Sequence, residues 1–344
     1  MRNKLGGYLE LDLRAEIIDT NKSIYDCWVK DSPFLALDCS RSALREIIRI
    51  EGISSILLPY YICNDVKVTL SQLNVNAVYY SIDENFKPIL DNFHELKNFD
   101  AMIVVSYFGL AIDDKMLQEV KSQNSNLIVI EDKAQSLDES SKVADWAIYS
   151  PRKLVGVPDG SIAVAKAPLS QSLLAKYSKK DSSLFLENVS PILMRYYDKE
   201  MNLCQYDSYL RSESKFDKKI YEISTLSLDL LKIYSYEKIS SKRKLNWKYL
   251  DNKLSDLAIT NFQSEVTPLG YPIKVADPDS FVKYMAQRGI FCARHWKDIG
   301  DYDENFHYEF CLSNSVVTIP CDQRLGYSDL DLIIKNIREY YEKR

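Results

Sequence analysis

The sequence predicts an α/β fold in which a large domain, built on a mainly parallel sheet, is followed by a smaller α+β domain. Three observations support this. Short apolar runs alternate with stretches of helical periodicity through the first half of the chain. Several runs carry apolar residues at consecutive positions, as strands buried on both faces do. The length of 344 residues favours a second domain beside the first.

The predicted strands of the large domain follow one another with helical stretches between them, which is typical of a parallel sheet covered on both faces. They are Ser55–Leu58, Ala77–Ser81, Ala101–Ser106, Leu127–Glu131, Asp145–Ser150 and Ser161–Ala165. Helical periodicity is clear at Ser42–Glu51 and Lys115–Gln123. The last two strands are too close for a helical crossover, so an antiparallel strand is expected there.

The pattern changes to helices rich in Tyr, Lys, Glu and Ser from about Ala167 to Tyr249, with Leu226–Ile239 as the clearest amphipathic helix. The later elements are a strand near Gly270–Val275, a helix at Pro278–Arg288, strands at Ile290–Ala293 and Ser315–Pro320, and a helix at Ser328–Glu342. We therefore expect a large domain with an N-terminal arm over residues 1–240 and a small domain over residues 241–344.

Composition and charge exclude several classes of function. The net charge is −5 and no basic stripe follows a predicted helix, so a nucleic-acid partner is not expected. The start of the chain does not resemble a signal peptide, and no run approaches the roughly 18 apolar residues of a membrane span. The seven scattered cysteines and three distant histidines indicate free thiols in a reducing cytoplasm and no metal site.

Polar residues follow two successive strands where an open α/β sheet binds its ligands. Asp132 follows the run Leu127–Glu131, while Ser150 and Lys153 follow the next strand. Pyridoxal 5'-phosphate (PLP) needs a lysine amine for a Schiff base and a carboxylate at its pyridine nitrogen. Ser150 lies one turn before the lysine, where its hydroxyl can donate to the phosphate. Singly, these residues are as well explained as a helix cap, a turn residue and a surface lysine; together they predict a PLP site.

The same motifs resemble those of the DegT family of sugar aminotransferases over most of the chain. Residues Glu131 to Gln135 are similar to the family motif E-D-x-A-Q, in which the acid contacts the pyridine nitrogen and the glutamine lies near the ring hydroxyl. Lys153 falls on the family's Schiff-base lysine, where the sugar dehydratases of this fold carry histidine. Further similar segments are Cys39–Leu44, Leu58–Cys63, Val78–Asp83, Ser106–Gly109, Ser224–Ser227, Arg243–Tyr249, Gly289–Ile290 and Pro320–Arg324.

The resemblance implies the PLP-dependent transferase fold of type I, with a seven-stranded type of sheet. It also implies ping-pong transfer of an amino group from an amino acid, glutamate by expectation, to a nucleotide-linked or related keto-sugar, in cell-surface polysaccharide or related sugar biosynthesis. A cytoplasmic homodimer is expected on the same ground. Two alternatives remain: another PLP reaction on this fold, and a non-catalytic relative that binds a sugar or a partner protein.

Three departures from the family pattern bear on the site. The Gly-Thr of its phosphate-binding turn is Ser40-Arg41 here, so the guanidinium of Arg41 either pairs with the phosphate or lies on the helix surface. The aromatic residue that stacks on the ring is replaced by Cys63; Tyr61 or its neighbour Tyr60 takes that role, or both belong to the core. The asparagine that the partner subunit sends to the phosphate has no counterpart, Ile220 being nearest.

Two residues of the predicted small domain are candidates for substrate binding. His295 lies in a loop that either borders the substrate or has no role. Arg324 either binds the carboxylate of glutamate or a sugar phosphate, or forms a structural ion pair with Asp322 or Asp329. Lys133, beside Asp132, is expected to point away from the cofactor ring.

Overall fold

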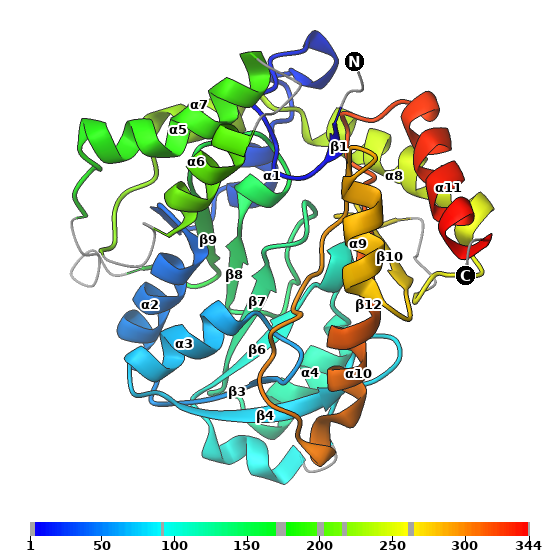
Figure 1. Cartoon of the computed structure of the whole chain (residues 1–344). Helices are drawn as coiled ribbons and strands as arrows, with labels where there is room; N and C mark the ends of the chain where they lie inside the picture. Colours follow the sequence, from blue (N-terminus) through cyan, green and yellow to red (C-terminus); the bar gives the residue numbers. More distant parts are fainter. Residues whose placement is uncertain are drawn as a thin grey trace.

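The computed structural model describes residues 4–90, 93–169, 177–197, 203–214, 219–260 and 265–342. Its centre is an eight-stranded sheet with helices packed on both faces (Figure 1). Across the sheet the strands are β2 (Phe34–Leu37), β9 (Ser161–Ala165), β8 (Trp146–Tyr149), β7 (Ile128–Lys133), β6 (Ala101–Val105), β3 (Ser55–Pro59), β4 (Asn76–Ile82) and β5 (Pro88–Ile89).

The sheet confirms the predicted topology. Strands β8, β7, β6, β3 and β4 are parallel neighbours, while β9 is antiparallel to both β8 and β2. The two-residue β5 pairs antiparallel with β4 and adds an eighth strand to the seven expected. Every residue of β6, β8 and β9 is buried, which explains their continuous apolar runs. Strand β2 was not predicted, although Phe34–Leu37 is a run of four apolar residues.

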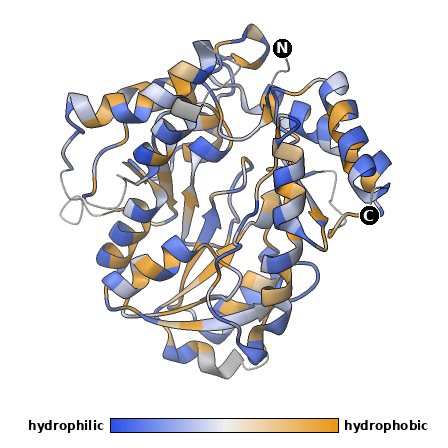
Figure 2. Cartoon of the chain, in the orientation of Figure 1, coloured by the Kyte–Doolittle hydropathy of each residue, from blue (hydrophilic) through white to orange (hydrophobic). Residues whose placement is uncertain are grey.

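The helices of the large domain are α1 (Ile24–Val29), α2 (Ser40–Glu51), α3 (Asn64–Gln72), α4 (Asp114–Gln123), α5 (Ser182–Tyr197), α6 (Leu203–Glu213) and α7 (Thr225–Ile233). In α2 the apolar residues recur on one face, and Ala43, Leu44, Ile47 and Ile48 are buried against the sheet. The helix ends at Gly52, which adopts the left-handed conformation at φ 65°. Figure 2 shows the hydrophobic strands enclosed by helices of mixed hydropathy.

The predicted helix Leu226–Ile239 is wrong, because the chain forms two helices there. Helix α7 ends at Ile233, and α8 (Tyr236–Leu254) begins after Ser235, whose side chain accepts a hydrogen bond from the backbone of Lys238. Residues 18–24 of the N-terminal segment bond to the backbone of residues 233–235. This pairing needs extended backbone between the helices, and helical periodicity carries no sign of it.

The C-terminal unit has its own core beside the main sheet (Figure 1). Its strands β10 (Tyr271–Lys274) and β12 (Val316–Ile319) are antiparallel, and β11 (Ile290–Phe291) pairs in parallel with the N-terminal β1 (Leu5–Gly6). Its helices are α9 (Pro278–Ala286), α10 (His307–Ser315) and α11 (Tyr327–Glu342). The domain boundary predicted at residue 240 falls within α8.

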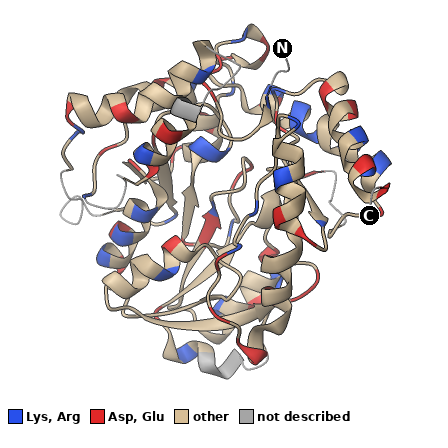
Figure 3. Ribbon diagram, in the orientation of Figure 1, with Lys and Arg blue, Asp and Glu red and all other residues tan. Residues whose placement is uncertain are grey.

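Figure 3 shows that positions of positively and negatively charged residues are interspersed along the helices. Within the described ranges, no helix combines the length and the apolar character that crossing a membrane requires.

Candidate active site

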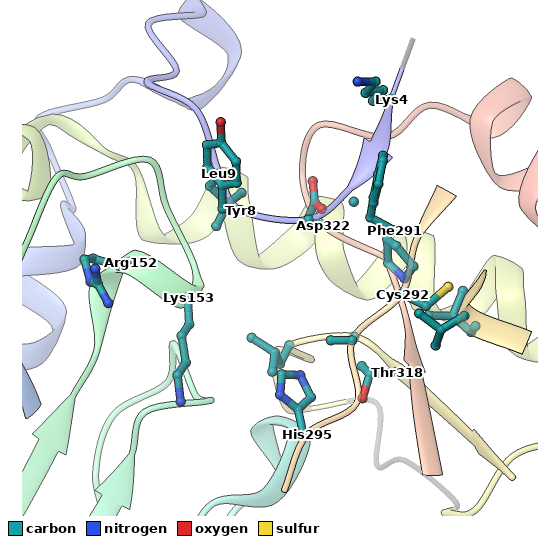
Figure 4. Close-up of a pocket in the computed structure, with 18 of the residues that line it drawn as sticks. Lys4, Tyr8, Leu9, Arg152, Lys153, Phe291, Cys292, His295, Thr318 and Asp322 are labelled. Carbon is teal, nitrogen blue, oxygen red and sulfur yellow. The ribbon is translucent and has the colours of Figure 1, made fainter. Parts of the chain in front are cut away.

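A cavity of about 1180 Å³ lies beside the turn that follows the carboxyl end of β8. Its walls come from the N-terminal arm, the turn after β8, helices α5 and α6, and the C-terminal unit (Figure 4). Segments from both ends of the chain therefore enclose one space.

Lys153 extends into this cavity from the short 3-10 helix η4 (Pro151–Lys153), which follows β8 (Figure 4). Ser150 precedes the helix, and its carbonyl accepts a hydrogen bond from the backbone N–H of Lys153 at 3.2 Å. Proline at the first helical position fixes the backbone for this turn. The side chain of Ser150 is buried and that of Lys153 is exposed to the cavity.

Asp132 lies near the carboxyl end of β7, on the strand adjacent to β8. Because side chains alternate along a strand, Glu131 and Lys133 point to the opposite face, where they form a buried ion pair at 3.0 Å. Lys133 thus points away from Asp132, as predicted. Burial raises the pKa of Asp132, and the opposing effects are the charge of Lys153 and a hydrogen bond from the backbone of Ala134. The carboxylate is therefore one that a further cation would stabilise.

Gln135 carries a donor without an acceptor. Its Oε1 accepts a hydrogen bond from the backbone of Phe108 at 2.8 Å. Its Nε2 is buried and has no partner among the described residues. Phe108 belongs to the 3-10 turn η3 (Tyr107–Gly109) after β6 and has φ 54°, an unusual conformation for an aromatic residue. A buried N–H without an acceptor is costly, so this amide suits a ligand oxygen.

The first turn of α2 has the features of an anion site. Cys39, at the N-cap, gives no side-chain cap, and the backbone N–H groups of the first turn lack acceptors within the helix. The hydroxyl of Ser40 is buried without a partner in the described part of the chain. A helix N-terminus favours negative charge. The unpartnered hydroxyl of Ser40, together with these backbone N–H groups, makes this turn a candidate phosphate-binding site, called the phosphate cup below.

Arg41 and Arg152 are both engaged with carboxylates near this turn. Arg41 donates to Asp65 at 3.1 Å and its side chain is largely buried. Arg152, beside Lys153, forms a bidentate pair with Glu213 at the end of α6, at 2.5 and 2.9 Å. Burial raises the pKa of Glu213, but Arg152 and then Arg41 and Lys153 together bring it below its ordinary value. Arg41 is therefore close enough to act on Glu213, while the residue it bonds, Asp65, is exposed to solvent.

His295 faces Lys153 across the cavity (Figure 4). Burial, together with the charge of Lys153, lowers the pKa of His295 to about 3. The imidazole is therefore neutral near neutral pH. Cys63 is close to the same groups: burial raises the pKa of its thiol, and the charge of Lys153 opposes this rise.

Both tyrosines that follow β3 lie in the hydrophobic core. The ring of Tyr60 stacks on Phe306 with centroids 4.2 Å apart. The ring of Tyr61 has no exposed surface and packs against Tyr107 and Trp296. This agrees with the core alternative for both residues, and a stacking role for Tyr61 stays a prediction. Ile220 also packs against this core rather than offering a polar group.

Arg324 forms a structural ion pair with Asp322, which was one of the two predicted alternatives. It donates twice to Asp322, at 2.8 and 2.9 Å, and once to Glu10 of the N-terminal arm at 2.5 Å. Glu10 also pairs with Arg195 of α5 at 3.1 Å. Each guanidinium thus has a carboxylate, and the four side chains join three segments of the chain. Binding of a substrate anion by Arg324 stays a prediction.

Several cavity residues have no role in the sequence prediction. Tyr8 of the arm stacks on Tyr209 of α6, with centroids 4.5 Å apart and planes 4° from parallel. Tyr206, three residues before Tyr209, also lines the cavity. The arm crosses the turn after Lys153 where a Cβ on Gly156 would lie 1.7 Å from the carbonyl oxygen of Glu10. The glycine was the only sequence signal of this close approach.

Comparison with solved structures identifies the fold. A sugar aminotransferase of Streptococcus pneumoniae, Spr1654, aligns with 98% of this chain and 98% of its own, with a TM-score of 0.68 and 15% identity. It has also been solved in PLP and PMP forms. A DegT DnrJ EryC1 StrS aminotransferase from Brucella abortus aligns over 89% and 85%, with a TM-score of 0.60 and 15% identity.

A third neighbour is the sugar aminotransferase CalS13 from Micromonospora echinospora, with a TM-score of 0.62, 14% identity and coverage of 89% and 87%. No family sequence model matches the chain, and no curated protein matches it. The likeness therefore lies in the backbone and not in overall sequence. The chain has the fold of these PLP-dependent sugar aminotransferases.

Proposed function

We propose that the protein is a PLP-dependent aminotransferase. The observation that carries the proposal is that Lys153, which lines the cavity, lies within electrostatic reach of the buried Asp132 on the adjacent strand of a sheet with the aminotransferase fold. The charge of the lysine acts on the carboxylate, so the two groups are close. A lysine amine and a carboxylate are the two groups that this cofactor requires.

The other residues of the site fit the same cofactor. The unpartnered Nε2 of Gln135 suits the ring hydroxyl, and the unpartnered hydroxyl of Ser40 suits the phosphate at the N-terminus of α2. We propose Ser150 and Arg41 as further phosphate ligands. Asp132 would accept the hydrogen bond of the protonated pyridine nitrogen, which would supply the cation that its buried carboxylate favours.

When bound, the cofactor supplies an electron-accepting ring for the transfer of an amine. Lys153 holds it through Nζ and, when freed, moves a proton at the reacting carbon of the substrate. Asp132 keeps the pyridine nitrogen protonated. The neutral imidazole of His295, on the opposite wall, can hydrogen-bond the substrate without adding charge beside the lysine.

For the substrates we propose an amino acid donor, glutamate, and a nucleotide-linked keto-sugar as acceptor. The solved neighbours are described as sugar aminotransferases. The cavity is large enough for a ligand of that size. Its wall holds the rings of Tyr206 and Tyr209, with planes 25° apart and centroids 6.4 Å apart, and a base can stack on such aromatic surfaces. A role in polysaccharide biosynthesis, a cytoplasmic location and a homodimer belong to the same proposal.

One observation favours the non-catalytic alternative. Glu213 places a carboxylate near the proposed phosphate cup, and its pairing with Arg152 occupies a cation that could bind phosphate. A chain that had lost its cofactor would tolerate this arrangement. A measurement of PLP binding distinguishes the two, because a chain that had lost its cofactor would not bind PLP.

The test is covalent trapping on the intact protein. After incubation with PLP and reduction with borohydride, peptide mapping should place the cofactor on Lys153, and Lys153→Ala should abolish the visible absorption band. Lys142→Ala, at an exposed lysine, serves as the control and should label normally. Labelling at another lysine, or no labelling of folded protein, would remove the proposal. A panel of amino acid donors and keto-sugar acceptors then separates sugar transamination from other PLP reactions.

A further inference from the structure

The carbonyl of Leu154, the residue after Lys153, receives two side-chain hydrogen bonds. Arg243 of α8 donates from Nη2 at 3.0 Å, and Gln323 donates from Nε2 at 3.0 Å. Arg243 also donates from Nε to the Oε1 of Gln323 at 2.8 Å. All three side chains are almost completely buried. The turn that carries the lysine is therefore fixed by two residues outside the large sheet.

The same guanidinium reaches the other side of the site. Its Nη1 donates to the carbonyl of Leu269 at 2.9 Å. The N–H of Leu269 donates to the carbonyl of Phe108 at 2.9 Å, and the N–H of Phe108 donates to Gln135 at 2.8 Å. An unbroken series of hydrogen bonds thus runs from Gln135 through Arg243 to the residue after Lys153.

The segment around Leu269 is held close to η3 as well. A Cβ on Gly109 would lie 2.3 Å from the carbonyl oxygen of Thr267. There is no room for this segment to move toward η3, so a displacement of Arg243 is passed on to Phe108. Rigid, fully bonded networks of this kind transmit geometry between the groups at their ends.

Arg243 forms no salt bridge within the described ranges. Its hydrogen bonds go to neutral oxygens, although the carboxylate of Asp322 is near enough to favour its charge. Burying a guanidinium without a directly bonded carboxylate is costly, and an apolar or neutral residue would pack a domain contact at lower cost. The planar guanidinium, however, bonds the carbonyls of Leu154 and Leu269 through different nitrogens.

From this geometry we infer that Arg243 and Gln323 are positioning residues for the proposed reaction. They hold the turn that carries Lys153 at a fixed distance from Gln135. The amine of Lys153 and the side-chain amide of Gln135, proposed to bond the ring hydroxyl, can then both contact one bound cofactor. The inference rests on the proposed function for its chemical meaning. The linkage between the two turns is a separate claim and can be measured without any cofactor.

Two substitutions separate positioning from simple packing. Gln323→Glu is isosteric and keeps an acceptor for Arg243, but it replaces the donor to Leu154 with an oxygen. Arg243→Lys keeps the charge, but an ammonium cannot reach all the oxygens that the fork reaches. Arg338→Lys, at an exposed arginine of the same unit that pairs with Asp256, is the control.

The measurement is hydrogen exchange of the cofactor-free proteins. Arg243→Lys should speed exchange in both residues 107–110 and residues 153–157, whereas Gln323→Glu should speed it in residues 153–157 alone. Arg338→Lys should change neither segment. Unchanged exchange in residues 153–157 of folded Gln323→Glu would overturn the inference. If Arg243→Lys exchanges faster throughout, it has a folding defect, and Gln323→Glu alone then decides.

Both variants should raise the dissociation constant for PLP about 5- to 10-fold, as expected for one lost buried hydrogen bond. The pH midpoint of the visible band should rise in Gln323→Glu, because the added carboxylate favours a protonated nitrogen at Lys153. A packing role would leave that midpoint unchanged. Failure of the wild type to bind PLP would remove the proposed function, while the exchange result would still decide the linkage.

Discussion

Replacing Gly156 by alanine should release the N-terminal arm from the cavity. The new Cβ would lie 1.7 Å from the carbonyl oxygen of Glu10, whereas real Cβ contacts are essentially never shorter than 3.0 Å. The arm must therefore move by more than about 1 Å. That movement strains the bonds of Glu10 to Arg324 and Arg195, at 2.5 and 3.1 Å.

The expected cost has two parts. Forcing an atom into a packed region costs about 1–3 kcal/mol. Loosening a charge-assisted hydrogen bond of Glu10 adds about 1.5–3 kcal/mol. We therefore expect Gly156→Ala to lower the free energy of unfolding by roughly 2.5–6 kcal/mol.

Urea unfolding followed by tryptophan fluorescence measures this change, and trypsin reports the arm directly by cleavage after Arg14. Gly326→Ala is the control, because its Cβ would meet two side-chain oxygens at 3.7 and 4.0 Å, which are ordinary contact distances. The reasoning is refuted if Gly156→Ala unfolds within about 0.5 kcal/mol of the wild type and resists trypsin equally well.

Three further predictions concern the site. Asp132→Asn should leave the fold intact and slow transamination by orders of magnitude, since an amide cannot keep the pyridine nitrogen protonated; turnover near the wild-type rate would exclude this role. Arg41→Ala should weaken PLP binding roughly 10- to 150-fold if the guanidinium contacts the phosphate, and a change below about threefold in a titration of the apo-protein would place Arg41 outside the cup. His295 has a lower pKa in the folded chain than its ordinary value of 6.5, so protonation opposes folding and stability falls as the pH drops from 6.5 toward 3. His295→Gln should therefore lose about 1–2 kcal/mol less than the wild type between pH 7 and pH 4.5, and equal acid sensitivity in urea unfolding would contradict this.

The sequence predicted what depends on local pattern. Strands buried on both faces show themselves as continuous apolar runs, and β9 was recognised as antiparallel because the connection from β8 is short. The order of Asp132 and Lys153 after successive strands predicted that they would meet, because parallel strands end at one edge.

Contacts between segments far apart in the sequence could not be predicted from local pattern. Glu213 is 61 residues from Arg152, and nothing near either residue indicates their pairing. The break between α7 and α8 depends on backbone bonds from residues 18–24. Apart from the bond to Gln323, the hydrogen bonds of Arg243 go to backbone carbonyls, which are present at every position and therefore cannot be recognised from side-chain pattern.

The pairing of β1 with β11 has a consequence for the order of assembly. It joins Leu5 to Ile290, so β1 is synthesised long before the strand with which it pairs. The main sheet can close earlier, because its final strand, β9, ends at Ala165. A nascent chain that stops short of residue 290 would therefore hold a formed sheet with Lys153 in place but an undocked arm. The wall that residues 291–322 give to the cavity is added only afterwards.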